Sequence, residues 1–102
     1  MKIDDAVIAL SALAHKARLE IIRMLVQRGG AGASAGDIAD HLGAAPSAVS
    51  FHLSGLTDAG LIKAHRQSRH QIYKVQYDAL GALMGYIVKD CCASDVRVTK
   101  CC

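Results

Sequence analysis

The sequence predicts a mainly helical domain that carries one β-hairpin, with its elements in the order ααααββα. The composition supports this, because 52% of the 102 residues are hydrophobic but only 4% are aromatic. Small aliphatic side chains must therefore fill the core, which suits packed helices better than a β-sandwich. The hydrophobic pattern supports it too, since apolar residues recur at helical spacing except between about residues 61 and 77, where they alternate as in strands.

Two helices are predicted in the first third of the chain. The apolar residues of the first helix, about residues 4–13, are Ala6, Val7, Leu10 and Leu13. The buried stripe expected for the second helix, about residues 15–27, consists of Leu19, Ile22, Leu25 and Val26. Arg18 is then expected to face water or a phosphate. The glycine-rich residues 29–32 end the second helix, because glycine adopts left-handed conformations at little cost.

A third and a fourth helix follow, joined by a short turn. Ser34 is a good N-cap for a helix over about residues 35–42, and Gly43 ends that helix. Pro46 suits the first position of the fourth helix, which Gly60 ends. The inward residues of the fourth helix are Val49, Leu53 and Leu56. Two helices joined by a short turn that contains glycine are typical of a helix-turn-helix.

The rest of the chain predicts a hairpin and a last helix. The strands are expected over residues 61–66 and 71–77, joined by a polar tip at residues 67–70. The last helix, about residues 78–90, should begin with Asp78 as its cap. Its expected buried residues are Leu80, Leu83, Met84, Ile87 and Val88. Residues 93–100 are expected to be mobile. We therefore divide the chain into a domain of residues 1–90 and a tail of residues 91–102.

The charge and hydropathy of the chain indicate which partners the protein could have. The net charge of +3 is small, but four Lys or Arg and three His lie between residues 44 and 77 against the single acid Asp58. This local basic surface suits a phosphate backbone, although an ordinary solvated face is an equal alternative. There is no apolar run of the ~20 residues that a membrane span needs, and no signal peptide at the N-terminus. We expect a soluble, cytoplasmic protein with no membrane partner.

Three stretches of the sequence resemble the ArsR/SmtB repressors. Residues 12–22, ALAHKARLEII, resemble the ALADPTRLRIL stretch of that family. Residues 47–56 resemble its recognition helix, and residues 59–62, followed by a basic hairpin and a tyrosine, resemble its wing. The resemblance implies a winged helix-turn-helix that binds double-stranded operator DNA as a homodimer, with the outer helices paired across the two-fold axis. It implies no enzymatic activity.

The sequence also departs from that family at its inducer sites. The Cys-x-Cys of the arsenic-responsive members would fall near residues 34–40, where this chain has no cysteine. The Asp and His ligands that other members carry on the last helix are incomplete, because that helix has no histidine. In the wing, Ser68 stands where the family usually has glycine.

The resemblance and the chemistry of the side chains together indicate the DNA contacts. Small and polar side chains on a recognition helix let its backbone enter the major groove, where they bind base edges or phosphates. Phe51 is expected either to touch a thymine methyl group or to pack against the hairpin. The candidate DNA-binding residues are Ser47, Ser50, Phe51, His52 and Ser54 on the helix, and Arg66, Arg69 and His70 in the wing.

All four cysteines lie in the tail, as Cys91, Cys92, Cys101 and Cys102. Clustered thiols in a reducing cytosol indicate metal binding or redox chemistry rather than disulfides. We expect Cys91, Cys92 and one of the last two to bind trivalent arsenic or antimony, which prefer three sulfurs. This would make the chain a repressor that releases its operator when the metalloid binds.

Other functions of the cysteines remain open at this point. Cadmium, lead or zinc could be the inducer, and so could oxidation or persulfidation of the thiols. A cysteine-rich metal carrier is an alternative of another class, although it would have no use for a helix-turn-helix. A thiol oxidoreductase lacks support because the chain has no Cys-x-x-Cys after a strand, and neither a catalytic triad nor a phosphate loop is present.

Overall fold

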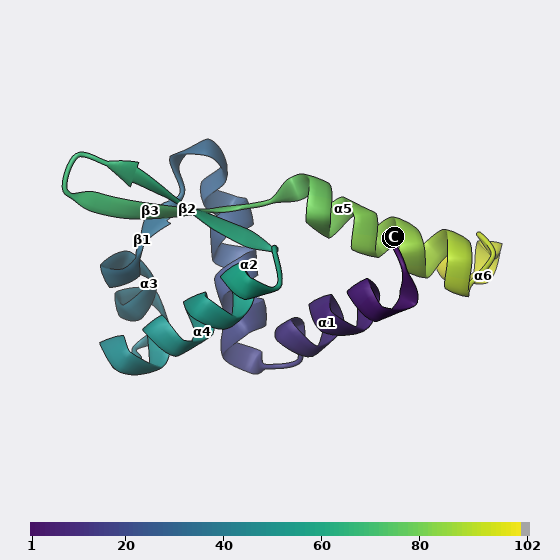
Figure 1. Ribbon diagram of the computed structural model, residues 1–102, viewed down its shortest axis with the longest axis horizontal. Coiled ribbons are helices and arrows are strands. Elements are labelled where there is room, and N and C mark those ends of the chain that lie inside the picture. The colour runs from purple at the N-terminus through teal and green to yellow at the C-terminus, as the bar shows by residue number, and fades with distance from the viewer. Residues whose placement is uncertain (101–102) are drawn as a thin grey trace.

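The computed structural model describes residues 1–100, and Cys101 and Cys102 lie outside the described residues. The elements in order are α1 (Ile3–Leu13), α2 (Lys16–Arg28), the 3-10 turn η1 (Gly29–Ala31), β1 (Ala33–Ser34), α3 (Ala35–Leu42), α4 (Pro46–Asp58), β2 (Ile62–Gln67), β3 (His70–Val75), α5 (Tyr77–Gly85), the π-helical turn η2 (Tyr86–Cys91) and α6 (Val96–Thr99). The predicted winged helix-turn-helix order is confirmed, and the structure adds β1, η2 and α6 to it (Figure 1).

Local chemistry accounts for the helix-turn-helix formed by α3 and α4. The Ser34 hydroxyl accepts a hydrogen bond from the Asp37 amide at 3.1 Å, and the Asp37 carboxylate accepts one from the Ser34 amide at 3.2 Å. The same bonds lower the pKa of Asp37. Gly43 ends α3 in a left-handed conformation, and Pro46 opens α4, as the sequence predicts.

The wing is a three-stranded antiparallel sheet in the order β1-β3-β2. Ile62 pairs with Val75 at its base, and Gln67 pairs with His70 at its tip. The sequence did not reveal β1, because two residues are too few for a period. Gly32 leads into this strand with φ 62°, and a Cβ there would come within 2.5 Å of the Tyr73 carbonyl oxygen. Only glycine therefore lets β1 lie this close to β3.

The core lies where α2, α3, α4 and the base of the sheet meet. Its fully buried side chains include Ile21, Leu25, Ile38, Val49, Leu56, Leu61 and Leu83. The predicted stripe on α2 is wrong by about one residue. Leu19 and Val26 are exposed, whereas Arg18, Ile21 and Met24 are buried beside the correctly predicted Ile22 and Leu25.

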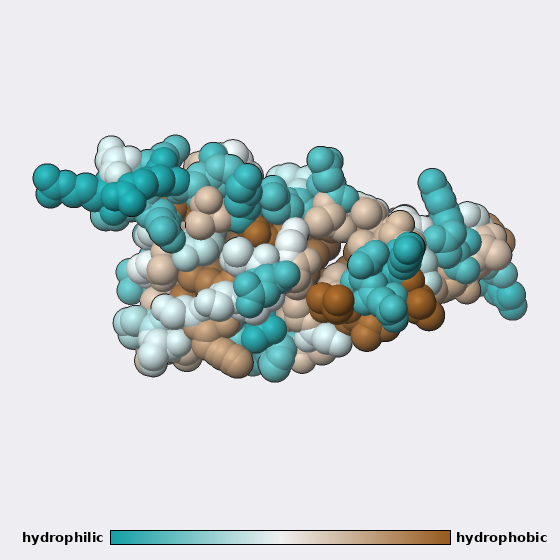
Figure 2. All heavy atoms as spheres, in the orientation of Figure 1, coloured by the Kyte–Doolittle hydropathy of each residue, from teal (hydrophilic) through white to brown (hydrophobic). Residues whose placement is uncertain are grey.

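An apolar surface remains exposed on the outer helices. On α1 the alanines at positions 6, 9 and 12 face the core, while Ile3, Val7 and Leu10 are exposed. Figure 2 shows hydrophobic atoms gathered over this helix. Met84 on α5 was predicted to be buried but is also exposed. Such a surface on a single chain indicates a protein interface.

The last helix differs from its prediction at both ends. It begins at Tyr77, so Asp78 lies in its first turn, and the N-cap Gln76 makes no side-chain bond. After Gly85 the backbone continues as the π-helical turn η2, and residues 93–100 contain the short helix α6 rather than an irregular segment. The predicted boundary between residues 90 and 91 thus falls within η2. No helix among residues 1–100 has the length and apolarity to cross a membrane.

Candidate nucleic-acid interface and cysteine site

The exposed face of α4 is made of small polar residues and one phenylalanine. Ser47, Ser50 and Ser54 are exposed, and Phe51 shares their side of the helix at 3.6 residues per turn. The residues that hold α4 to the core, Val49, Leu53 and Leu56, lie on the opposite side. The structure thus brings four of the five predicted helix contacts together on one face that is free to enter a major groove.

His52 lies at the flank of this face rather than on it. At about 100° per residue its side chain is turned away from the serines and toward α2, and it is half-buried. Its Nδ1 accepts a hydrogen bond from Arg18 Nε at 3.1 Å. Burial, followed by the charges of Arg18 and His15, lowers the pKa of His52 below its ordinary value of 6.5.

Arg18 is the main correction to the sequence analysis, which expected it to face water or a phosphate. Its side chain is only 7% exposed. Its Nη1 donates to the Ala12 carbonyl oxygen at 3.3 Å, so Arg18 joins the end of α1 to α4. The guanidinium fits because Gly55 on α4 has no side chain: a Cβ there would lie 2.6 Å from Arg18 Cζ.

Phe51 packs against His52 and Arg18. The sequence had left open a thymine methyl group or the hairpin as its partner. The Phe51 ring centroid lies 5.6 Å from that of His52 and 5.3 Å from Arg18 Cζ. The side chain nevertheless stays 58% exposed, which leaves its outer face available to a thymine methyl group.

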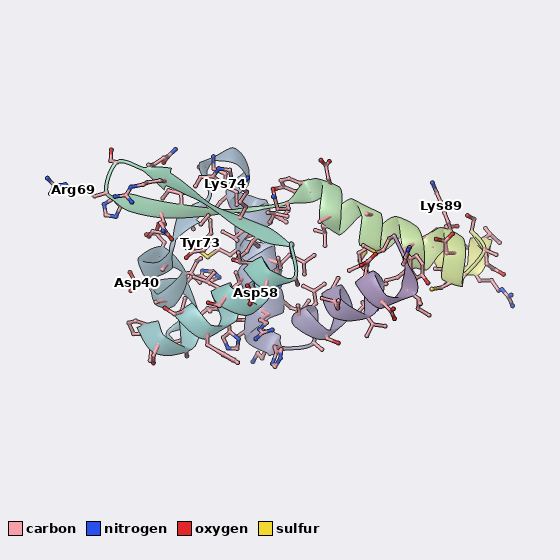
Figure 3. The ribbon with its side chains drawn as sticks, viewed as in Figure 1. Asp40, Asp58, Arg69, Tyr73, Lys74 and Lys89 are labelled. Atoms are coloured by element: carbon pink, nitrogen blue, oxygen red, sulfur yellow. The ribbon has the colours of Figure 1, made fainter. Side chains whose placement is uncertain are left out.

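The three predicted wing residues lie at or near the hairpin tip. Arg66, Arg69 and His70 are all exposed, and Figure 3 shows Arg69 extending away from the tip. Ser68 takes the left-handed conformation, with φ 54°, at the position where we expected the family's glycine. The tight turn therefore forms without glycine, at a small cost in backbone strain.

The two described cysteines lie at the end of the last long helix. Cys91 is exposed, Cys92 is half-buried, and both are free thiols. Cys91 is the last residue of η2, whereas the backbone at Cys92 is no longer helical, with φ −111° and ψ 3°. Burial, the nearby Cys91 and Asp90, and a hydrogen bond with Cys91 all raise the pKa of Tyr86.

The described part of the chain does not complete a metal site. Among residues 1–100 no group of three His, Cys, Asp or Glu side chains is placed to hold an ion. The other two predicted ligands, Cys101 and Cys102, lie outside the described residues. The sequence analysis missed Arg18, Gly55 and Tyr86, and only Arg18 carried a signal, since it shares the helical spacing of Ile21, Ile22 and Leu25.

Comparisons with known proteins agree with this geometry. A family model described as a helix-turn-helix domain matches residues 13–64. The HTH-type transcriptional regulator YgaV of Escherichia coli K12 is 35% identical over 81 residues, which cover 79% of this chain and 80% of that protein.

Solved structures of two further proteins are similar to the chain. An ArsR-like transcriptional regulator from Rhodococcus sp. RHA1 has a TM-score of 0.78 at 24% identity, covering 95% of this chain and 89% of that one. A homodimeric winged helix-turn-helix DNA-binding domain from Mycobacterium bovis, a possible ArsR-family regulator, has a TM-score of 0.69 at 28% identity, covering 79% and 73%. YgaV and the Rhodococcus protein are described as transcriptional regulators, and the M. bovis domain as part of a possible one. The chain therefore belongs to the helix-turn-helix transcriptional regulators that bind DNA, and its winged fold is that of the ArsR-like regulators.

Proposed function

We propose that the chain is a repressor that releases its operator when Cys91, Cys92 and one of Cys101 and Cys102 bind trivalent arsenic or antimony. The observation that carries this proposal is the pair of free, adjacent thiols at the end of the last long helix, where Cys92 is already outside helical geometry. Neighbouring helical residues point about 100° apart. Release of Cys92 from the helix removes this obstacle to joint binding of one ion.

The chain around the thiols also supports the proposal. Ala93 and Ser94 both adopt left-handed conformations, with φ 51° and 54°. The Ser94 amide donates to the Val88 carbonyl oxygen at 2.7 Å, and the Asp95 amide donates to the Cys92 carbonyl oxygen at 2.9 Å. This tight turn and the helix α6 that follows it are consistent with a tail that returns toward Cys91 and Cys92. A third sulfur from Cys101 or Cys102 would complete the trigonal set that arsenic and antimony prefer.

The position of the thiols suggests how binding could act on DNA. They follow α5, which together with α1 carries the exposed apolar surface, and the relative from M. bovis is a homodimer. A metalloid that holds the tail in one conformation would alter the end of this surface. Release then requires the ligand to bind the DNA-free dimer more tightly than the DNA-bound one. The expected coupling is about 1–3 kcal/mol, and DNA must weaken metalloid binding by the same factor.

Fluorescence anisotropy of a labelled operator duplex, titrated with arsenite in a phosphine reductant, tests the proposal. Cys91→Ser and Cys92→Ser should each abolish release, because each leaves the proposed three-thiol site with two of its sulfurs, which hold the ion weakly. Cys101→Ser and Cys102→Ser should be mild alone and severe together if the two thiols substitute for each other. Ser94→Ala, in the same turn but without a thiol, is the matched control and should respond like the parent.

The same assay distinguishes the other inducers. Release by cadmium, lead or zinc but not by arsenite or antimonite would assign a different metal, and release by peroxide or persulfide alone would assign a redox switch. A protein that binds metalloid but no DNA would be a carrier. Retention of arsenite-dependent release after Cys91→Ser/Cys92→Ser would contradict the tail assignment.

A further inference from the structure

The contact between Arg18 and His52 determines which nitrogen of the histidine carries its proton. Arginine remains protonated at all accessible pH values and has no acceptor atom. Its Nε lies 3.1 Å from His52 Nδ1, so Nδ1 must be the acceptor. A neutral imidazole has one N–H, which must then be on Nε2. The lowered pKa of His52 agrees with a neutral ring.

Arg18 itself is held from two sides. Its Nη1 bond to the Ala12 carbonyl oxygen orients the guanidinium from the end of α1, and the Phe51 ring lies 5.3 Å from its Cζ. Gly55 supplies the space on α4. Among residues 1–100 the ion pair that the structure records is Arg97 with Asp95, far along the chain, so a carboxylate does not explain why Arg18 is buried. A buried charge that is held by hydrogen bonds and an aromatic ring, without a carboxylate, points to a role beyond stability.

His52 also lines an open hollow between α2, the end of α3 and the start of α4. This hollow of about 510 Å³ is lined by Lys16, Ala17, Glu20, Leu42, Ala44, Ala48 and His52. Lys16 and Arg18 bring positive charge to the site, and Glu20 opposes it. His52 is at the flank of the serine face, which is the position of the sugar-phosphate backbone when that face enters a major groove. Phosphate oxygens are acceptors, so they require a donor there.

We propose that Arg18 is a positioning residue for DNA binding: it selects the Nε2–H tautomer of His52, which then donates to a backbone phosphate beside the groove that α4 enters. Arg18 contacts no DNA in this arrangement and acts through His52. This proposal rests on DNA binding by the chain and not on the proposed inducer. Either proposal can therefore be refuted without affecting the other.

Two substitutions of His52 separate its two nitrogens. Asparagine places an acceptor near the Nδ1 position but ends short of Nε2, so His52→Asn keeps the partner of Arg18 and loses the donor. Glutamine reaches the Nε2 position with an amide that can donate, so His52→Gln keeps the donor and loses the partner of Arg18. His41→Asn, on an exposed histidine of α3, is the matched control.

DNA affinity is measured by anisotropy on a duplex selected from a random pool and on an unselected duplex of equal length. Loss of one hydrogen bond predicts that His52→Asn binds both duplexes about tenfold more weakly. His52→Gln should retain more affinity than His52→Asn, and His41→Asn should match the parent. A loss confined to the selected duplex would mean that His52 reads a base, and it would overturn the phosphate assignment, as would parental affinity in His52→Asn.

The protonated nitrogen of His52 can be measured directly, and a purely structural role of Arg18 would not change it. Long-range ¹H–¹⁵N spectra of the whole protein should show His52 protonated on Nε2 in the parent and as a mixture of tautomers in Arg18→Met, whose side chain is of similar length but has no N–H donor. Arg18→Met should weaken DNA binding as much as His52→Asn, and the double variant should bind DNA no more weakly than either single variant. If Arg18→Met does not fold, the parent spectrum and the DNA affinities of the two His52 variants still test the proposal. A proton on Nδ1 in the parent would refute the proposal.

Discussion

Gly55 offers a test of how much the buried arginine contributes to stability. A Cβ at this position would lie 2.6 Å from Arg18 Cζ and Nη2 and 2.7 Å from Nη1. The Arg18 side chain, rather than the helix backbone, would have to move. In Gly55→Ala the guanidinium would therefore leave its site and lose its bonds to His52 at 3.1 Å and to Ala12 at 3.3 Å.

The size of the effect follows from two opposing contributions. Loss of two hydrogen bonds from a charged donor costs about 2–4 kcal/mol, allowing for the water that replaces the acceptors. The gain from replacing glycine with alanine inside a helix is about 1 kcal/mol. Gly55→Ala should therefore lower the free energy of unfolding by about 1–3 kcal/mol, although helix propensity alone predicts an increase.

Urea unfolding followed by circular dichroism measures this free energy, with all proteins at one concentration so that any association between chains contributes equally. The matched control is Gly36→Ala on α3, where a Cβ would meet only Ser34 Oγ at 3.8 Å. This control should be as stable as the parent or up to about 1 kcal/mol more stable. Equal gains in Gly36→Ala and Gly55→Ala would refute the assignment of Arg18 to a tight, bonded site.

Three further predictions concern the wing, the dimer and pH. Arg69→Ala should weaken binding to all DNA sequences and reduce the slope of log affinity against log salt by about 0.9, the value for one phosphate contact; an unchanged slope would contradict that contact. Val7→Glu places a charge on the exposed apolar face of α1 and should shift sedimentation from dimer to monomer, and a dimer that persists would exclude this face. Because the pKa of His52 is lowered from 6.5, its neutral form contributes stability fully above pH 6.5, and this contribution falls as the pH drops below that value. Thermal unfolding between pH 5 and 8 should show this loss in the parent and a smaller one in His52→Asn.

The elements that the sequence predicted well are those specified by neighbouring residues. The Ser34 cap, the left-handed Gly43 and Pro46 at the start of α4 each act within a few residues, so their outcome does not depend on the rest of the fold. The serine face of α4 is of the same kind. Its buried residues repeat at helical spacing, which leaves the serines outside in any fold that buries that stripe.

The elements that the sequence did not predict depend on residues from distant segments. Two stripes on α2 have helical spacing, one through Leu19 and one through Arg18, and hydropathy predicts that the stripe through Leu19 is buried. The stripe through Arg18 is buried instead, because α4 supplies a hydrogen-bond acceptor at His52 and space at Gly55, more than thirty residues further along the chain. Leu19 is exposed in turn. A single sequence does not state which distant residues will meet, so Arg18 was expected on the surface, facing water or a phosphate.

The placement of the two candidate sites restricts how an inducer could work. The chain measures 45 × 23 × 22 Å, with the wing at one end of the long axis and η2 and α6 at the other (Figure 1). Arg69 and Lys89 mark these two ends in Figure 3. An ion held by Cys91 and Cys92 would therefore not obstruct the serine face of α4 of the same chain. Its effect would have to pass through the outer helices. Of these, α1 is connected directly to the DNA-binding helix by Arg18, which bonds both to Ala12 at the end of α1 and to His52 on α4.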